Sequence, residues 1–405
     1  MNVNWKKNFA IFMTSQAVSI LGSSLVQFAI TWHITLTTES GVAMTISILC
    51  GFLPTFLLSP FAGVWADRYN RKTLIMIADG CIALCTLAVA IVFMTGYQSL
   101  WVLYVASALR ALGAAVQNPC VSAMLPDLVP EKHLTRANSI NGTLQSAIML
   151  VSPMLGGTLF ANASITAIFF IDVVTAALAI GVMLLFLKVP HREKSAGGVK
   201  SDYFTEMKEG ISYIFHHKFL WLLFLYYMLF LFMVSPVAFL TPLQATRNYG
   251  RSAWRLSAIE IVFSVGMLAG GLLLTVWGGF KNRTKTTASA AVFMAVCTIA
   301  LGIPIPVIPY LAFMLLIGLT LPLFNTPATI ILQERVDPAY MGRVFSVMTM
   351  LNTGMMPLSM LVFGFLADMV RIEYLLLGTG AVMLITALSI FRSRLLLEAG
   401  KPRNP

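Results

Sequence analysis

Long apolar stretches alternate with short polar segments along the whole chain. Most stretches hold about 20 residues, the length that a helix needs to cross the hydrocarbon core of a bilayer. The pattern predicts twelve transmembrane helices, approximately at residues 9–36, 42–65, 73–95, 99–121, 136–160, 165–187, 219–243, 256–279, 285–303, 306–332, 343–367 and 373–391. We therefore expect an all-α membrane protein.

One polar segment is longer than the others and separates the predicted helices into two sets of six. Residues 189–218 begin with a stretch that contains Ser and Gly, and apolar residues then recur at helical spacing among charged ones. This pattern is typical of a flexible linker followed by a helix on a membrane surface. The sequence thus predicts a six-helix bundle over residues 1–188, a linker over 189–218 and a second six-helix bundle over 219–405.

The two halves repeat one motif at a separation of 207 residues. Val129-x4-Leu134-x-Arg136-x2-Ser139 aligns with Val336-x4-Met341-x-Arg343-x2-Ser346. The same shift aligns three pairs of polar residues: Asn118 with Asn325, Gln145 with Asn352 and Asp127 with Glu334. This repeat predicts two pseudo-symmetric bundles, an arrangement that places the substrate site near the bilayer midplane in many secondary transporters.

Composition agrees with membrane insertion and argues against other classes of protein. The chain is 58% hydrophobic and 11% charged, which leaves too little polar surface for a water-soluble protein of this size. The net charge of +11 does not indicate nucleic-acid binding, because the cations lie between the predicted helices. The five cysteines lie inside apolar stretches without metal-ligand spacing. We expect no metal, no cofactor and no catalytic residue.

The distribution of positive charge predicts the orientation in the membrane. Most of the 27 Lys and Arg residues lie in the termini and in every second loop, and the opposite loops hold only Arg247, Arg251, Arg255 and Arg371. Loops rich in Lys and Arg stay on the cytoplasmic side. We therefore expect both termini in the cytoplasm.

The loop between the second and third predicted helices carries the most specific motif. Residues 63–72 read Gly-Val-Trp-Ala-Asp-Arg-Tyr-Asn-Arg-Lys. This pattern resembles the signature loop of major facilitator superfamily transporters, with Asn70 where that family usually has Gly. Asn is the residue other than Gly that best tolerates a left-handed turn, so the difference is mild.

We expect this loop to act as a conformational latch, formed by Gly63, Asp67, Arg68, Arg71, Lys72, Asp127, Gly342 and Arg343. Asp67 should lie near Gly342 and Arg343, because the amides at a helix N-terminus favour an anion. Arg71 should pair with Asp127. Leu274 stands at the position of Asp67 in the second half, so the charged latch is predicted to be one-sided.

Ionisable residues inside the predicted helices are candidates for proton coupling, because charge is costly in a bilayer. They are Arg110, Asp79, Asp172 and Glu260. Arg110 keeps its proton and needs a carboxylate, carbonyl or water partner, either for coupling or as a structural link between helices. A carboxyl group in a site with little water can bind and release a proton near neutral pH. We favour Asp172 and Glu260 for this role and expect Asp79 to support the loop below it.

Uncharged polar and aromatic residues in the helices predict the wall of a substrate cavity. The candidates are Gln16, Gln27, Asn118, Asn141, Gln145, Tyr227, Phe230, Asn325 and Asn352. A large apolar surface with scattered amide groups suits a bulky, partly lipophilic compound better than a sugar or a small anion.

A segment in the fifth predicted helix bears on the direction of transport. Ser152-Pro153-Met154-Leu155-Gly156-Gly157 resembles the Gly-Pro-x-x-Gly-Gly signature of exporters in the same superfamily, with Ser in place of the first Gly. Pro153 would kink the helix, and Gly156 and Gly157 would allow close helix contact. Ordinary packing of small residues is the alternative.

Across its whole length the chain is similar to the twelve-helix drug–proton antiporters of this superfamily, and there to the bacterial macrolide efflux proteins. Matching segments include Gln16–Ser19, Gly51–Pro54, Ile171–Val173, Ser264–Leu274 and Tyr340–Ser346. The resemblance implies proton-driven export of a bulky hydrophobic drug, such as a macrolide, by a monomer in the bacterial inner membrane.

Alternatives to macrolide export are an exporter of tetracycline, a lysophospholipid or a siderophore-like compound on the same fold, and a passive facilitator. The chain has no Gly-x4-Gly-Lys-Ser/Thr loop for ATP. It also has no clustered nucleophile, base or metal site of the kind that an enzyme would need.

Overall fold

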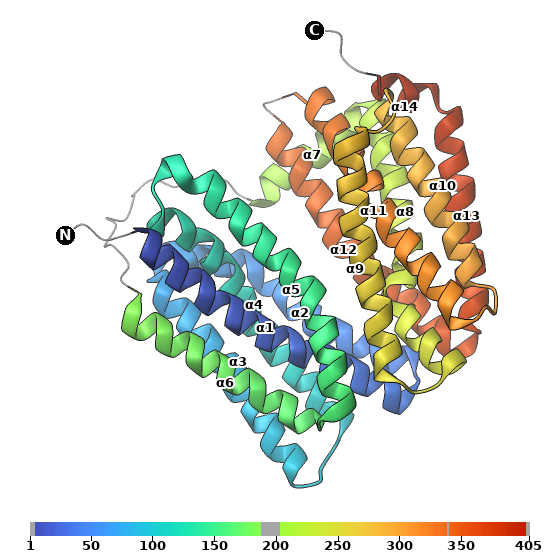
Figure 1. Ribbon diagram of the computed structural model, residues 1–405. Coiled ribbons are helices and arrows are strands. Elements are labelled where there is room, and N and C mark those ends of the chain that lie inside the picture. Colours follow the sequence, from blue (N-terminus) through green and yellow to red (C-terminus); the bar gives the residue numbers. More distant parts are fainter. Residues whose placement is uncertain (1–4, 188–202, 338–339, 402–405) are drawn as a thin grey trace. The chain divides into compact units, whose positions relative to one another are not determined.

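The computed structural model describes residues 5–187, 203–337 and 340–401, and for 59, 60, 63, 64, 67, 131, 135 and 203–207 the backbone alone (Figure 1). These residues form helices and no strand. Twelve helices are long and apolar enough to cross a membrane, which confirms the predicted all-α membrane architecture. They are α1 (Trp5–Thr38), α2 (Gly41–Arg68), α3 (Arg71–Met94), α4 (Leu100–Leu128), α5 (Leu134–Asn162), α6 (Ile165–Phe186), α8 (Lys218–Tyr249), α9 (Ala253–Trp277), α10 (Arg283–Leu301), α11 (Val307–Arg335), α12 (Met341–Met369) and α13 (Ile372–Arg392).

Most of these helices are longer than the apolar stretches that predicted them. The first begins at Trp5 rather than near residue 9, and the fourth continues to Leu128 rather than ending near residue 121. A helix satisfies its backbone hydrogen bonds internally, so it can continue beyond the hydrocarbon core into polar surroundings. The hydropathy pattern therefore predicts such helices to be shorter than they are.

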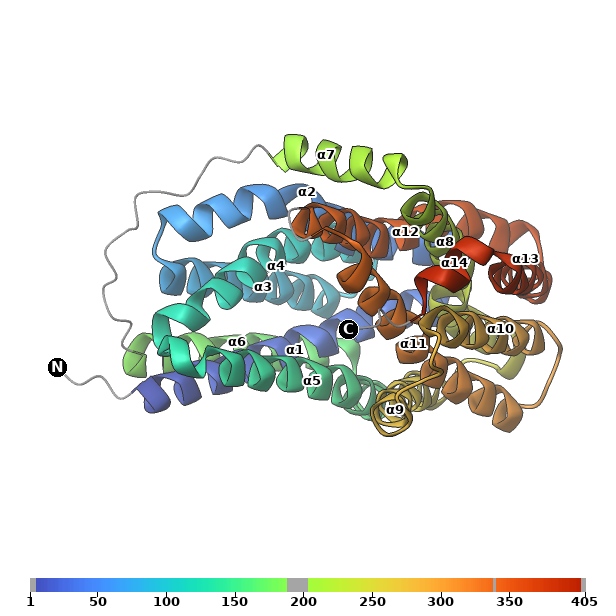
Figure 2. The same ribbon diagram turned by 90° about the horizontal axis from the view of Figure 1, so that it is seen from above.

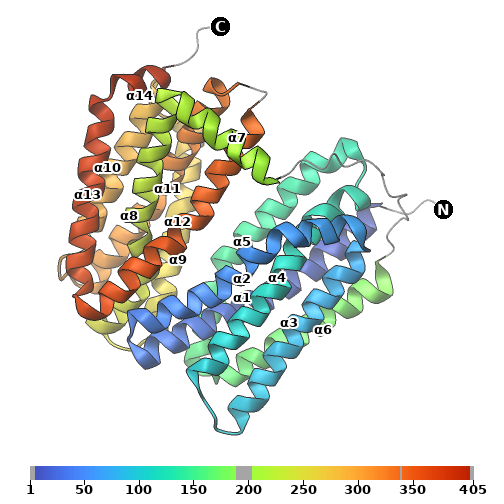
Figure 3. The same ribbon diagram turned by 180° about the vertical axis from the view of Figure 1, so that it is seen from behind.

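The chain divides into two compact units. Unit 1 holds α1–α6 and the segment Arg251–Ser257, and unit 2 holds α7–α14 and the segment Ser40–Val42. In unit 1, α1 lies beside α6 and α3 lies beside α4, while in unit 2 α10 lies between α11 and α13 (Figure 2, Figure 3). The functional residues of each unit are therefore best described within that unit.

Helix boundaries in the two units repeat with the interval found in the sequence. α4 and α11 begin at Leu100 and Val307 and end at Leu128 and Arg335. Both intervals are 207 residues long, and the same interval relates the two ends of α5 to those of α12. The internal repeat thus extends from sequence motifs to the lengths of helices.

The turn between α2 and α3 differs from the expectation for Asn70. Its backbone is extended, with φ −68° and ψ 113°, and its side chain accepts a hydrogen bond from the backbone N–H of Thr73. Asn70 therefore acts as an N-cap of α3 and not as a left-handed residue, since an Asn side chain can satisfy an N–H group that the first helical turn leaves free. Asn282 caps α10 in the same way.

A shorter helix, α7 (Tyr203–His216), follows the linker, as the amphipathic pattern predicts. It packs against α12 and α8 in unit 2. Tyr213 stacks on Tyr340 with ring centres 4.4 Å apart, and a Cβ atom at Gly210 would lie 2.7 Å from the backbone oxygen of Arg343. This contact with α12 is an addition to the predicted helix on a membrane surface. A last short helix, α14 (Arg394–Ala399), follows α13.

Candidate functional site

A buried ion pair links two helices inside unit 1. Arg110 of α4 places Nη1 2.6 Å from Oδ2 of Asp172 on α6. Arg110 is 6% exposed and Asp172 is fully buried. The sequence left Asp79, Asp172 and Glu260 open as partners for Arg110. In the structure the partner is Asp172 of α6.

Neighbouring helices complete the hydrogen bonding of this pair. The Thr86 hydroxyl of α3 lies 2.8 Å from Asp172 Oδ2 and also contacts Arg110 Nη1. Ser23 of α1 donates its hydroxyl to Asp172 Oδ1 over 3.2 Å and accepts from Arg110 Nη2 at its backbone oxygen over 3.1 Å. α1 approaches closely because Gly22 has no side chain, and a Cβ atom there would overlap Thr175. Four helices thus meet at one satisfied ion pair.

A second buried carboxyl group lies in a different environment. Asp79 of α3 is 2% exposed, and its Oδ1 accepts from the Ser19 hydroxyl and from Gln117 Nε2, each over 2.7 Å. Its Oδ2 has no hydrogen-bond partner among the residues that the structure describes. The environment of Asp79 is therefore polar but uncharged at contact distance. The contacts of Asp79 thus lie inside the bundle, and the expected support of the loop below stays a prediction.

The two sites form layers along the same three helices. Thr86 follows Asp79 by seven residues on α3, and Gln117 follows Arg110 by seven residues on α4. Seven residues are about two helical turns, or about 10 Å along a helix axis. The layers are therefore stacked along the bundle, one built on an ion pair and the other on a lone carboxyl group.

A pocket of about 210 Å³ in unit 1 lies beside these layers. Arg110 and Gln117 line it, together with the predicted cavity residues Gln27 and Asn118. Asn141 and Gln145, predicted for the same wall, lie on α5 and do not line it. Amide groups, serine hydroxyls and aliphatic carbons thus share one concave surface next to a buried charge.

Sequence reasoning missed four side chains of these layers: Ser19, Ser23, Thr86 and Gln117. Each is uncharged, so none stood out against the apolar helices. The signal that could have found Thr86 and Gln117 is their spacing of seven residues from the charged positions, because residues two turns apart lie on the same face of a helix.

Three further predicted cavity residues meet in unit 2. The Tyr227 hydroxyl of α8 lies 3.0 Å from Asn325 Oδ1 on α11 and 2.8 Å from Asn352 Oδ1 on α12. One hydroxyl proton serves a single acceptor at a time, so one of the two amides must turn its NH₂ group to the phenol oxygen. Asn352 Nδ2 already donates to Met348. Asn325 is therefore the amide that turns, and the three side chains form a chain of hydrogen bonds.

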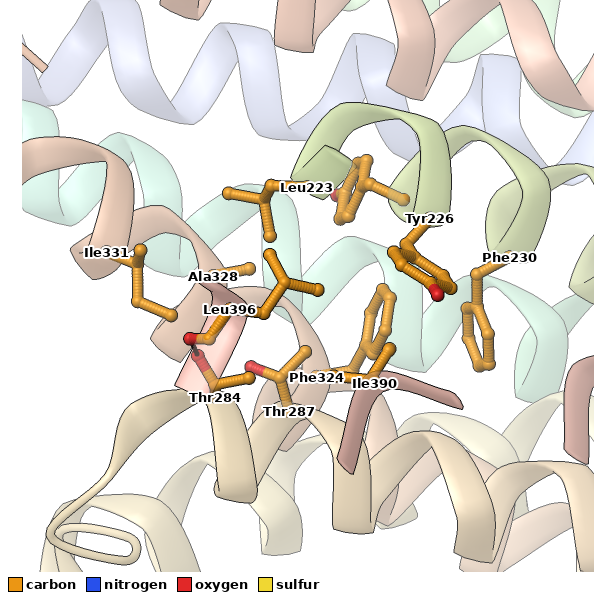
Figure 4. Close-up of a pocket in the computed structure, with 11 residues that line it drawn as sticks. Leu223, Tyr226, Phe230, Thr284, Thr287, Phe324, Ala328, Ile331, Ile390 and Leu396 are labelled. Carbon is orange, nitrogen blue, oxygen red and sulfur yellow. Dashed lines mark hydrogen bonds between the residues drawn. The ribbon is translucent and has the colours of Figure 1, made fainter. Parts of the chain in front are cut away.

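An apolar crevice lies between the helices of unit 2 (Figure 4). It is lined by Leu223, Tyr226, Tyr227, Phe230, Thr284, Thr287, Phe324, Ala328, Ile331, Ile390 and Leu396. Phe230 and Phe324 stack with ring centres 4.3 Å apart. The free volume is about 20 Å³, which holds about one water-sized sphere. Tyr227 and Phe230 thus pack the interior of this unit at the crevice, which is too small for a drug-sized molecule.

Glu260, the third candidate carboxylate, lies on α9 and belongs to unit 2. The structure therefore does not bring it together with Arg110, Asp79 or Asp172 within one unit. Part of the residue is accessible. Its role in coupling stays a prediction.

The residues of the predicted latch are only partly described. Arg71 donates from Nη1 to Asp127 Oδ2 over 2.7 Å and to the backbone oxygen of Ala123, which is the expected pairing. Lys72 donates to the backbone oxygen of Leu187 over 2.8 Å. Arg68 is the exposed last residue of α2. At Gly63 and Asp67, two further residues of the predicted latch, the structure describes the backbone alone.

Two contacts in unit 2 bear on the same prediction. Arg343 forms an ion pair of 3.0 Å with Glu209 of α7. Arg283 of α10 forms an ion pair with Glu334 of α11. Arg283 is the first residue of α10, as Arg71 is of α3, and Glu334 stands at the repeat position of Asp127. Each unit thus joins its third and fourth spans by an Arg–carboxylate contact, while the one-sidedness expected at Asp67, where Leu274 stands in the second half, stays a prediction.

The residues that resemble the exporter signature lie in α5. Pro153 is inside the helix. A Cβ atom at Gly157 would overlap Ser257, a residue of the same unit, whereas one at Gly156 would lie 3.6 Å from Phe28, an ordinary contact distance. Close helix approach therefore depends on Gly157 and not on Gly156.

Comparisons with known proteins agree with this architecture. The family model described as Major Facilitator Superfamily matches residues 9–360. Macrolide efflux protein A of Streptococcus pyogenes is 29% identical over 388 residues, which cover 95% of each chain. Macrolide efflux protein A of Enterococcus faecalis is 31% identical over 324 residues, which cover 79% of this chain and 100% of that protein.

The fold also matches solved transporters. The crystal structure of the POT family transporter PepTSo aligns with a TM-score of 0.71 over 96% of this chain and 98% of that chain, at 10% identity. At this identity the match speaks for the fold alone. Together with twelve candidate spans and a family model that covers most of the sequence, it leads to one conclusion: the chain is a multi-pass membrane transporter that belongs to the Major Facilitator Superfamily and is related to macrolide efflux proteins.

Proposed function

We propose that this transporter exports a bulky hydrophobic compound, such as a macrolide, in exchange for protons and by alternating access. The observation that carries the proposal is a pocket in unit 1 whose wall includes a buried, ion-paired Arg110. Charged residues in membrane helices are costly and mark the paths of ions and substrates. The carrier of the coupling proton is sought among Asp79, Asp172 and Glu260.

The composition of the pocket favours an amphipathic substrate. Aliphatic residues such as Ile20 and Ile82 alternate with Gln27, Asn118 and serine side chains along its wall. Such a wall binds apolar area and orients a few polar groups. The relatives named macrolide efflux protein A make a macrolide the first compound to test.

The remaining parts of the proposal concern the membrane and the cycle. We place the protein in the bacterial cell membrane as a monomer, with both termini in the cytoplasm, because Lys and Arg are concentrated in the termini and in every second loop. We assign the loop of residues 63–72 to a latch that forms in one state of the cycle and breaks in the other. The contact between Arg71 and Asp127 would stiffen that loop.

Transport in everted membrane vesicles tests this proposal. Vesicles that carry the transporter should take up radiolabelled erythromycin when a proton gradient is imposed, and vesicles from cells without the gene provide the control. Nigericin, which dissipates the pH gradient, should reduce uptake to the control level. Uptake that nigericin leaves unchanged would contradict proton coupling and favour a passive facilitator or another ion.

The same vesicles separate macrolide export from the alternative substrates. Erythromycin uptake equal to the control, with gradient-driven uptake of tetracycline, a lysophospholipid or a siderophore, would move the assignment to an exporter of that compound. If none of these compounds is taken up in the presence of the gradient, the proposal as a whole is contradicted.

A further inference from the structure

The two buried carboxyl groups of unit 1 differ in what holds their charge. Asp172 receives Arg110 at 2.6 Å and hydroxyl groups from Thr86 and Ser23. A carboxylate with a cation at contact distance and donors on both oxygens is stable in its ionised form. Asp172 is therefore the counter-charge of Arg110 in this bundle.

Asp79 has no such compensation. Both of its donors, Ser19 and Gln117, are neutral and bind the same oxygen, Oδ1. Its other oxygen is buried and has no partner among the described residues. An ionised carboxyl group in this position keeps half of its charge without a donor, which is costly away from water.

We propose that Asp79, and not Asp172, binds the exchangeable proton, and that Gln117 links its protonation to the pocket. This inference rests on the proposed proton-coupled export. The proton adds to Oδ2 when the carboxylate becomes a carboxylic acid, and it leaves to water when the acid ionises. The oxygen that binds the proton is thus the one that lacks a donor.

A second buried oxygen without a partner among the described residues lies on α1. Gln16 is 1% exposed, and its Oε1 also has no partner among the described residues. It precedes Ser19 by three residues, so the two side chains lie on the same face of α1 within one turn. Ser19 already contacts Asp79. The Gln16 amide oxygen is thus the acceptor that we assign to a proton on Asp79 Oδ2, because both atoms are buried without a partner among the described residues.

Gln117 connects the carboxyl group with the pocket, because it lines the pocket and donates its amide to Asp79 Oδ1. Its bond to Asp79 is stronger when the acceptor is a carboxylate than when it is a neutral acid. Ionisation of Asp79 thus draws the Gln117 amide away from the pocket, and protonation releases it. When Asp79 is protonated, the released Gln117 amide occupies part of the pocket. If the substrate needs that space, the proton and the substrate cannot bind at the same time.

The charged groups around Asp79 do not compensate the negative charge of its carboxylate. On the neighbouring helices the nearest charged groups are Asp172 of α6 and Arg110 of α4, which pair with each other in the other layer. On α3 itself, Lys72 lies two turns away and donates to a backbone oxygen. From α1 the printed contact is the neutral hydroxyl of Ser19. Among the residues that the structure describes, Asp79 therefore has no ion pair that would compensate its charge.

Infrared difference spectroscopy of the purified full-length protein tests this assignment without a substrate. Between low and high pH, the wild type should lose a carboxylic acid C=O band, and the Asp79→Asn variant should lack that band completely. Asn preserves the shape of Asp and can still accept from Ser19 and Gln117, so this variant should fold. Asp79→Glu should retain a band at a shifted frequency.

Two further variants serve as matched controls. Glu373→Gln removes another buried carboxyl group. Glu373, like Asp79, accepts a hydrogen bond from an amide, that of Asn248, but it also lies beside Arg371. Asp172→Asn removes the competing candidate for the proton carrier. Both should retain the band. A band that survives in Asp79→Asn, disappears in Asp172→Asn or is absent from the wild type would overturn the assignment.

Erythromycin binding at different pH values separates this inference from the proposed function. If one proton leaves for each drug bound, affinity rises up to tenfold per pH unit in the wild type across the range in which Asp79 titrates. In Asp79→Asn, affinity should be independent of pH. A wild-type affinity that is independent of pH would contradict proton antiport, whereas a pH dependence that remains in Asp79→Asn would contradict the role of Asp79.

Discussion

The buried pair of Arg110 and Asp172 should be strongly coupled in its effect on stability. Replacing Asp172 with Leu leaves the Arg110 guanidinium with the Ser23 backbone oxygen and the Thr86 hydroxyl as its contacts. Replacing Arg110 with Leu leaves a fully buried carboxylate with two hydroxyl donors. Removal of one partner from a buried ion pair costs about 3–5 kcal/mol, whereas removal of both charges is nearly neutral when the replacement packs well.

The magnitude follows from this asymmetry. Each single variant should lose about 3 kcal/mol or more of its free energy of unfolding. The Arg110→Leu/Asp172→Leu double variant should lose about 2 kcal/mol or less. The coupling energy of the pair is then several kcal/mol in size. A loss of about 3 kcal/mol corresponds to a change of about 100-fold in the ratio of folded to unfolded protein.

A double-mutant cycle in mixed micelles provides the measurement. The free energy of unfolding is obtained from SDS titration of the wild type, both single variants and the double variant. The exposed pair of Arg251 and Glu39, with Nε and Oε1 2.7 Å apart, is the control and should give a coupling energy below about 1 kcal/mol. A coupling energy for Arg110 and Asp172 no larger than that of the control pair would refute the reasoning.

Three other predictions concern the latch, helix packing and the polar cluster of unit 2. Asp67→Asn should reduce transport without lowering the amount of protein in the membrane; normal vesicle uptake would leave the loop as a topological signal. Gly22→Ala should cost about 1–3 kcal/mol, because its Cβ atom overlaps Thr175, and Thr175→Ala should recover part of this loss in SDS titration. Tyr227→Phe should lower stability by about 1 kcal/mol in SDS titration, because it removes the hydroxyl that bonds Asn325 and Asn352; an unfolding free energy equal to that of the wild type would contradict this.

Some features of the candidate site were within reach of the sequence. The pairing of Arg71 with Asp127 follows from opposite charges at the ends of adjacent helices. Gln27 and Asn118 were expected in one cavity wall and do line one pocket. Tyr227, Asn325 and Asn352 were also expected together, and they meet in unit 2. In the last two cases a polar residue in an apolar helix was the signal.

The partner of Arg110 could not be predicted from the sequence. Asp79, Asp172 and Glu260 all lie in apolar helices, and each could in principle compensate a buried guanidinium. The choice depends on which helices are neighbours and on how each is rotated about its axis. The neutral donors Ser19 and Gln117 were equally hidden, since only their contact with Asp79 distinguishes them from other polar residues.

The sequence by itself determined the number of spans, their approximate positions and the repeat of six helices. A bilayer requires about 20 apolar residues per helix and internal satisfaction of every backbone hydrogen bond, so this information is local to each segment. The tertiary structure alone decided which buried charges are compensated, because compensation requires atoms from several helices within hydrogen-bond distance. That decision separates Asp172, which is held by a cation, from Asp79, which is not.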